Sequence, residues 1–294
     1  MFIMLNKIKL DLLNLGLKFI SIDEKIVRMF LETKPSNTNK IVILPAVNFV
    51  MKKILNKLQN KSVHGRVCNG RLNGVNVSVI SSLVGSPNCA ITVESLKRCN
   101  VKAIIRVDFC GGIENDSDQP QIKIGDILIP KNVYCGDGTS PSYISNNSEI
   151  LPQMKYASNP MSKMLDIKSI NENVFITQPN DELKKIILQE GSEYKIKEAN
   201  LWTTDALFCE TQEFIDSLKS INVQGVDMES SILFLLGNIY KIKTASVLSV
   251  SDLPGNSKYD LFKSNEIHPN MEIGIDNAIK VVSNALPKIN SILK

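Results

Sequence analysis

The chain has 294 residues, which is enough for one large hydrophobic core or at most two domains. Its hydrophobic fraction of 43% and charged fraction of 22% are ordinary for a soluble globular protein. The formal net charge of +4, without a long basic run, argues against a nucleic-acid partner. No segment has the length and freedom from charge of a membrane span. We therefore expect a soluble, cytoplasmic protein with no membrane contact.

Apolar periodicity predicts helices and strands that alternate along the chain. A helix over residues 11–31 and the linker after it form an N-terminal helical extension, residues 1–39. Strands are predicted at residues 40–44, 75–81, 103–107, 125–130, 196–202 and 244–248. Helices are predicted at residues 47–58, 88–98, 181–190, 212–219, 232–236 and 273–286. This alternation indicates an α/β fold with a largely parallel or mixed sheet.

Residues 136–173 differ in composition from the rest of the chain, because they are rich in Ser, Asn, Pro and Gly. We expect a loop-rich insertion there, over a site or at a subunit contact, within a domain that spans residues 40–294. The sequence offers little for metal or disulfide chemistry. With only His64 and His268 available, we expect no metal site. Six cysteines without a Cys-x-x-Cys pair are typical of free thiols in a reducing compartment.

Two acids stand out because each ends an apolar segment. Glu229 lies in Gly-Val-Asp-Met-Glu-Ser-Ser, and Asp252 ends Ser-Val-Ser-Asp. An acid at the carboxyl end of a strand lies where open α/β sheets gather ligand groups. Two such acids suit an enzyme that holds sugar hydroxyls and protonates a leaving group. The residues alone also allow a helix-start acid at Glu229 and a turn or cap aspartate at Asp252.

Six segments in this order resemble the nucleoside phosphorylase family, which includes purine nucleoside phosphorylase and uridine phosphorylase. They are SSLVGSP (81–87), IRVDFCGG (105–112), IGDI (124–127), TTD (203–205), VDME (226–229) and SD (251–252). The resemblance implies a single-domain α/β/α sandwich with a central mixed, partly closed β-sheet. It also implies a homo-oligomer, from dimer to hexamer, in which neighbouring subunits complete each site. The family's reaction attacks C1′ of a nucleoside with phosphate, a co-substrate, and needs no cofactor.

The resemblance also assigns roles to substrate-binding residues. Glu229 would accept hydrogen bonds from the ribose hydroxyls, since a carboxylate can accept both protons of a diol. Met228 would pack against the sugar, with Asp227 in the same binding segment. Leu207 and Phe208 lie where the family places residues of the base pocket, although core packing explains them equally well.

Asp252 decides the predicted base. It matches the acid of the purine branch, which donates a proton to N7 of the leaving base. The uridine branch lacks this acid and uses a glutamine and an arginine. Gln212 could match that glutamine, but Phe214 stands near the place of the arginine. The resemblance therefore favours purine nucleosides over pyrimidine nucleosides.

The anion site departs most from the family pattern. Arg106 matches the arginine that binds phosphate. In the first phosphate loop, however, Ala46 replaces a glycine and Val50 an arginine, and in the second loop Asp108 and Phe109 replace a glycine and a serine or threonine. Arg106 and Asp108 lie two apart in a strand-like segment, so their side chains should project from the same face. We expect them to pair, which would place the Asp108 carboxylate in the position where phosphate would bind.

The sequence thus predicts an enzyme like purine nucleoside phosphorylase, weak or altered because its phosphate site is changed. Two alternatives stay open. One is a phosphate-independent nucleosidase, in which Asp108 is the only new acid that could activate water. The other is a catalytically inactive homologue that binds nucleosides or acts as a scaffold. In each case the expected partner is a small-molecule nucleoside.

Overall fold

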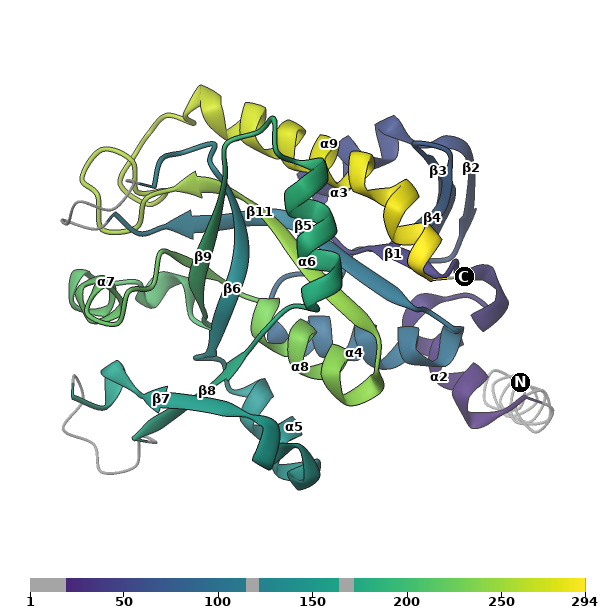
Figure 1. Ribbon diagram of the computed structural model, residues 1–294, viewed down its shortest axis with the longest axis horizontal. Coiled ribbons are helices and arrows are strands. Elements are labelled where there is room, and N and C mark those ends of the chain that lie inside the picture. The colour runs from purple at the N-terminus through teal and green to yellow at the C-terminus, as the bar shows by residue number, and fades with distance from the viewer. Residues whose placement is uncertain (1–19, 115–121, 164–171, 294) are drawn as a thin grey trace, which may run out of the picture.

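The computed structural model describes residues 20–114, 122–163 and 172–293 (Figure 1). The helices in these ranges are α2 (Ile22–Leu31), α3 (Asn48–Lys57), α4 (Ser86–Leu96), α5 (Thr139–Asn146), α6 (Asp181–Glu190), α7 (Gln212–Lys219), α8 (Ser230–Tyr240) and α9 (Pro269–Ile292). The strands are β1 (Ile41–Ile43), β2 (Gln59–His64), β3 (Val67–Leu72), β4 (Val75–Val79), β5 (Ala103–Gly112), β6 (Ile127–Cys135), β7 (Lys155–Ser158), β8 (Asn173–Thr177), β9 (Ile196–Thr203), β10 (Gly225–Asp227) and β11 (Lys243–Asp252).

The eleven strands of the described residues form one mixed sheet. Ten of them follow the order β2-β3-β4-β1-β5-β10-β9-β6-β8-β7. The remaining strand, β11, pairs parallel to β5 and antiparallel to β6. Because β10 joins β5 to β9, and β9 joins β6, the strands β5, β10, β9, β6 and β11 close on themselves. The predicted mixed, partly closed sheet is confirmed.

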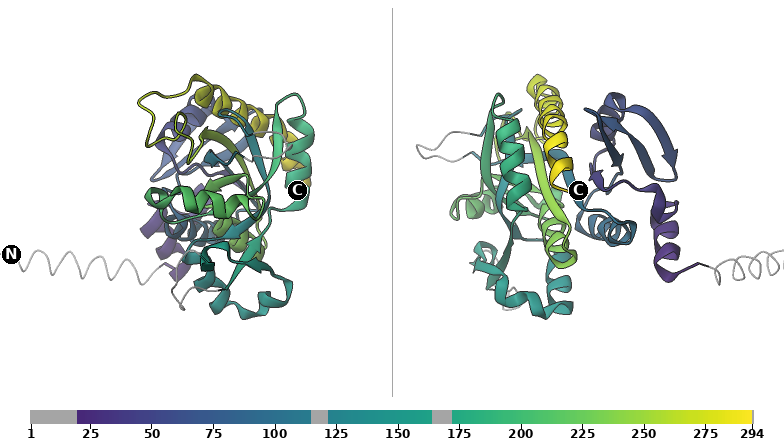
Figure 2. Two further views of the ribbon diagram at one scale, coloured as in Figure 1. Left: turned by 90° about the vertical axis from the view of Figure 1, so that its left-hand side faces the viewer. Right: turned by 45° about the vertical axis from the view of Figure 1, so that its right-hand side comes forward.

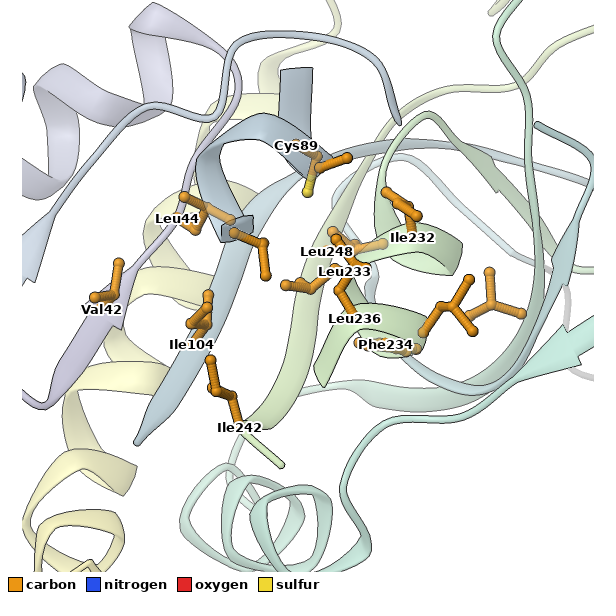
Figure 3. Close-up of a cluster of buried hydrophobic side chains, with 14 of the residues drawn as sticks. Val42, Leu44, Cys89, Ile104, Ile232, Leu233, Phe234, Leu236, Ile242 and Leu248 are labelled. Atoms are coloured by element: carbon orange, nitrogen blue, oxygen red, sulfur yellow. The ribbon is translucent and has the colours of Figure 1, made fainter. Parts of the chain in front are cut away.

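Helices cover both faces of this sheet, as the strand pattern requires (Figures 1 and 2). Along β1, Val42 belongs to the core cluster that contains α2, α4 and α8. Its neighbours Ile41 and Ile43 belong to the cluster that contains α3, α6 and α9. Successive side chains of a strand point to opposite faces, so buried residues of both parities place a helical layer on each side. Figure 3 shows the first cluster, where Val42 and Ile104 lie near residues of α4 and α8.

Helix α2 is part of this core. Ser21 caps it by accepting a hydrogen bond from the amide of Glu24 at 3.0 Å. Val27 and Leu31 are fully buried in the same cluster as Leu96 of α4. Residues 1–19, which hold the rest of the predicted N-terminal extension, lie outside the described residues. The division into residues 1–39 and 40–294 stays a prediction.

The described residues of the segment 136–173 include regular secondary structure that the composition does not predict. It contains helix α5 and strand β7, which pairs antiparallel with β8. The polar sequence of α5 buries few side chains, Ser140 and Ile144 among them, so its hydrophobic pattern is too weak to be read as a helix. The helix is stabilised by packing of Ile144 in the first core cluster rather than by the helix propensity of its own residues. Short elements thus occur within the segment that was expected to be rich in loops.

Strand pairing brings the carboxyl ends of three strands to one place. β5 and β11 are parallel, with Arg106 opposite Ser246 and Asp108 opposite Leu248. At the end of this ladder Asp252 pairs with Gly111, and β10 meets the same glycine through Val226. The side chains that follow β10 and β11 therefore gather beside the second half of β5.

Among the described residues, no helix combines the length and the apolar character needed to cross a bilayer.

Candidate active site

A cavity of about 670 Å³ opens where these three strand ends meet. This volume lies within the usual range for small-molecule sites. Most of the predicted site residues lie together there. Two further residues, Glu210 and His268, also line the cavity, although neither was predicted as a site residue. The polar and apolar side chains that line it include Arg106, Asp108, Leu207, Glu210, Asp227, Met228, Glu229, Asp252 and His268.

Arg106 forms the centre of a buried ion cluster at one end of the cavity. Its side chain is 2% exposed. The Nη1 atom donates to Asp227 Oδ2 at 3.0 Å, and the Nη2 atom donates to Glu229 Oε2. Asp108 is farther away, with Oδ2 at 4.0 Å from Nη2. Arg106 and Asp108 thus form a long ion pair, and two other acids, Asp227 and Glu229, lie closer to the guanidinium.

Asp108 takes its hydrogen bonds from backbone amides instead. Its Oδ2 accepts from the amide of Ala46 and, at 3.3 Å, from that of Val47, both in the loop after β1. Its Oδ1 accepts from the amide of Phe109 at 2.9 Å. Burial raises the pKa of Asp108, whereas Arg106 and these amides oppose the rise. A carboxylate that holds loop amides beside a guanidinium makes the contacts of a bound anion.

Val50 was expected at the place of the family's loop arginine. In the structure it lies on α3, fully buried in the core cluster beneath that helix. A cationic side chain at this position would enter the core rather than the cavity. Ala46 does line the cavity, at the start of the same loop. The two departures from the family pattern therefore have different consequences. Ala46 changes the cavity wall, whereas Val50 belongs to the hydrophobic core.

Asp227, which was expected to bind substrate, lines the cavity and also holds other parts of the site in place. Its side chain is fully buried, and its oxygens already accept three hydrogen bonds. Thr203 Oγ1 donates to Oδ1 at 2.7 Å, while Arg106 and the amide of Ser230, at 2.9 Å, donate to Oδ2. The amide of Ser230 is one of the unpaired donors at the start of α8, so Asp227 also closes that helix end. Asp227 positions Arg106 and the β10–α8 turn.

Glu229 lines the cavity and keeps acceptor capacity. Its Oε1 accepts from the amide of Gly85 at 2.7 Å, and its Oε2 from Arg106. Gly85 has φ +98°, a conformation that L side chains rarely adopt. A carboxylate offers about four acceptor positions, so about two remain for a sugar diol. Burial raises the pKa of Glu229 to about 7 against the opposing effect of Arg106. Met228 lies next to it in the cavity wall.

Asp252 lies at the other end of the cavity, at the end of β11. Its Oδ1 accepts from Ser251 Oγ at 2.6 Å and its Oδ2 from the amide of Leu261 at 3.4 Å. Burial raises the pKa of this carboxyl, with a smaller contribution from Asp260. A raised pKa favours the protonated form that a general acid needs.

Glu210 is a functional candidate that sequence reasoning missed. It lines the cavity, and burial together with the charges of Asp252 and Asp260 raises its pKa to about 8. In the sequence it is one acid in a polar loop between a strand and a helix, with no motif to mark it. Only the fold shows that this loop lines the same cavity as Asp252 and lies close enough for the two charges to interact.

The two predicted residues of the base pocket separate in the structure. Leu207 lines the cavity. Phe208 does not line it: this side chain is 84% exposed and packs against Phe262, with ring centroids 5.0 Å apart. The two residues are neighbours in a short 3₁₀ helix, where successive side chains point about a third of a turn apart. Only one of them can face the cavity, so the expectation for Phe208 is corrected.

A profile of the phosphorylase superfamily matches residues 40–287. The chain belongs to this superfamily. The match covers most of the chain and confirms the membership of the nucleoside phosphorylase family, a group of pentosyltransferases, that the six sequence segments predict. The mixed, partly closed sheet of this structure agrees with that family membership.

Several proteins of known name are similar to this member of the superfamily. A guanosine phosphorylase of Halorubrum lacusprofundi is 23% identical over 223 residues, 75% of this chain and 80% of the relative. A purine nucleoside phosphorylase of the DeoD type from Buchnera aphidicola is 25% identical, over 80% of this chain and 92% of the relative. The crystal structure of uridine phosphorylase from Vibrio fischeri aligns with a TM-score of 0.67 at 20% identity, over 87% of this chain and 95% of that one. The names of these relatives differ in the nucleoside, which is guanosine, a purine nucleoside or uridine.

Proposed function

We propose that this phosphorylase-superfamily member cleaves the N-glycosidic bond of purine nucleosides. The observation that carries the proposal is the placement of Asp252 and Glu229 in the wall of one cavity, with Met228 beside Glu229. Glu229 would hold the ribose hydroxyls through its remaining acceptor positions, with Met228 against the sugar face. Asp252 would protonate N7 of the leaving purine, with Leu207 against the base.

The charge of the site supports this chemistry. One guanidinium, Arg106, faces three carboxylates, those of Asp108, Asp227 and Glu229. When all three are ionised, the cluster has two negative charges in excess. Cleavage of the glycosidic bond develops positive charge on the sugar, as in an oxocarbenium ion. Fixed negative charge in a buried site stabilises that transition state more than it stabilises the neutral nucleoside.

The second substrate is the open part of the proposal. Phosphate is the co-substrate that the family implies, and no other cofactor is proposed. Here Asp108 accepts the hydrogen bonds of the loop amides that an incoming anion would need. We therefore expect phosphorolysis to be weak, with a phosphate KM in or above the millimolar range. The same observation favours a second candidate function, hydrolysis by water. Uridine phosphorylase activity is less favoured because Asp252 suits a purine.

The test is to incubate the purified protein with inosine, adenosine and uridine, each with and without phosphate. We expect a purine base to be released, and inosine or adenosine to react faster than uridine. Faster cleavage of uridine would remove the purine assignment. Binding of inosine without release of base under either condition would instead identify a nucleoside-binding or scaffolding protein.

The proposal extends to assembly as a homo-oligomer, from dimer to hexamer, and to a role in purine salvage in the cytoplasm. The resemblance supports both. The exposed apolar side chains of Phe208, Phe262 and Ile267, in segments next to the cavity, are consistent with a subunit contact. Light scattering on the purified protein measures the mass; a monomer at all concentrations would remove the oligomer.

A further inference from the structure

One donor in the ion cluster has no partner. The Nε atom of Arg106 is buried, and no hydrogen-bond acceptor of the described residues meets it. The other two nitrogens of the guanidinium donate to Asp227 and Glu229. A buried donor that is part of a charged group is costly to leave unpaired. Because Arg106 lines the cavity, an acceptor from outside the chain can reach this cluster.

Asp108 lies beside the same guanidinium at a distance that leaves room for an oxygen atom. Its Oδ2 is 4.0 Å from Nη2 of Arg106, which is too long for a direct hydrogen bond. A polar separation beyond about 3.5 Å is commonly bridged by one water molecule. Three backbone amides occupy three of the roughly four acceptor positions of Asp108, so about one remains for the proton of a bound molecule.

The chemistry of the cluster selects a neutral molecule over an anion. When ionised, Asp227 and Glu229 together already exceed the single positive charge of Arg106, and Asp108 adds a further negative charge. At about 4 Å and an effective dielectric constant of about 20, one carboxylate weakens the binding of an anion roughly a thousandfold for each unit of its charge. The amides of Ala46 and Val47 are also already taken. Water can accept from the Arg106 guanidinium, whose Nη2 lies 4.0 Å from Asp108 Oδ2, and donate to that carboxylate without any of these costs.

We propose that water is the nucleophile in this cavity and that Asp108 is the base that activates it. The inference rests on the proposed function, cleavage of a purine nucleoside, and names its second substrate. The water oxygen forms a bond to C1′ as the bond from C1′ to N9 breaks. The electron pair of the broken bond stays on the base, N7 takes a proton from Asp252, and Asp108 takes the proton of the water. The products are free ribose and free purine, and solvent returns the proton from Asp108 to Asp252.

The experiment follows inosine cleavage by the whole protein in phosphate-free buffer and identifies the sugar product by mass spectrometry. We expect ribose rather than ribose 1-phosphate, at a rate that added phosphate leaves unchanged. Asp108→Asn should lower this rate by about 10²–10⁴, the scale of a lost general base, while calorimetry shows nearly unchanged inosine affinity. Asp181→Asn is the matched control, because this aspartate is exposed on α6, away from the cavity.

The outcomes separate the inference from the function on which it rests. A phosphate-dependent rate with ribose 1-phosphate as product overturns the role of water and leaves purine nucleoside cleavage intact. Ribose formation that Asp108→Asn leaves at the wild-type rate overturns the role of Asp108. Absence of base release in both buffers overturns the inference and the proposed function together. If Asp108→Asn does not fold, the product formed by the wild type still decides between water and phosphate.

Discussion

The two ends of the cavity treat their carboxylates differently. At the ion-cluster end, Asp108 and Asp227 each accept three hydrogen bonds. At the other end, Asp252 accepts two, one of them long, and the pKa of its neighbour Glu210 is raised to about 8. Hydrogen bonds stabilise the ionised form and burial without them stabilises the neutral form. The comparison shows that a guanidinium and backbone amides oppose the effect of burial on the carboxyls at one end of the cavity, whereas neighbouring acids add to that effect at the other.

The largest effect is expected at the proton-donating end. Asp252→Asn should lower the rate of base release from purine nucleosides by about 10²–10⁴, because the amide cannot protonate N7. Nucleoside affinity should change little. Steady-state kinetics with inosine measure the first and calorimetry the second, with the exposed Asp216→Asn on α7 as control. A wild-type rate in Asp252→Asn would remove this residue from the mechanism.

One substitution at the ion-cluster end should strengthen the binding of phosphate there. Asp108→Gly removes a carboxylate about 4 Å from the guanidinium and frees the amides of Ala46 and Val47. Removal of that repulsion, roughly 4 kcal/mol per unit of charge, should strengthen phosphate binding by up to about a thousandfold. Titration calorimetry with phosphate on wild type and variant measures the change. Micromolar phosphate binding by the wild type would show that Asp108 does not occupy the position where phosphate binds.

Glu229 belongs to the ion-cluster end, and its substitution should have the next largest effect. Glu229→Gln loses an ionised acceptor of the ribose hydroxyls, which we expect to cost about 2–4 kcal/mol, or roughly 30- to 700-fold in nucleoside affinity. Calorimetry with inosine measures this, with Glu213→Gln on the exposed side of α7 as a control. Unchanged affinity would mean that Arg106 and Gly85 use all of its acceptor capacity.

The sequence predicts much of the fold because strong local patterns determine it. The apolar runs at residues 103–107 and 244–248 become the adjacent parallel strands β5 and β11, and α6 and α7 have the predicted bounds. The β2–β3 hairpin gave no comparable signal, since β2 is almost entirely exposed and polar. Its pairing with β3 is a tertiary fact that local periodicity does not contain.

The site was predictable where a motif carries it and not where contacts decide it. Spacing of two along a strand placed Arg106 and Asp108 on one face, and both line the cavity. Spacing does not reveal that Asp227, distant in sequence, lies closer to the guanidinium than Asp108 does. Nor does it show that Phe208 points outward or that Glu210 faces Asp252. These facts depend on side-chain directions that only the packed structure fixes.

Glu210 allows a final test of the difference between the two ends. Burial and the charges of Asp252 and Asp260 raise its pKa from an ordinary 4.5 to about 8. Because the charge of Asp252 contributes to this rise, we expect the two carboxyls to influence each other's titration. The folded protein thus binds more protons than the unfolded chain between pH 4.5 and about 8. Its free energy of unfolding should therefore fall as pH rises through this window.

Glu210→Gln should remove that part of the pH dependence of stability and also change the pH profile of catalysis. Base release requires a protonated acid at Asp252, so the rate declines as pH rises and the pair loses its proton. Without the second carboxyl, the proton is lost earlier, and the alkaline limb should move to lower pH while the rate in acid stays close to wild type. Measurement of kcat/KM for inosine across pH, with Glu213→Gln as control, follows the limb. An alkaline limb at the wild-type position would show that Glu210 and Asp252 titrate independently, and the proton would then belong to Asp252 alone.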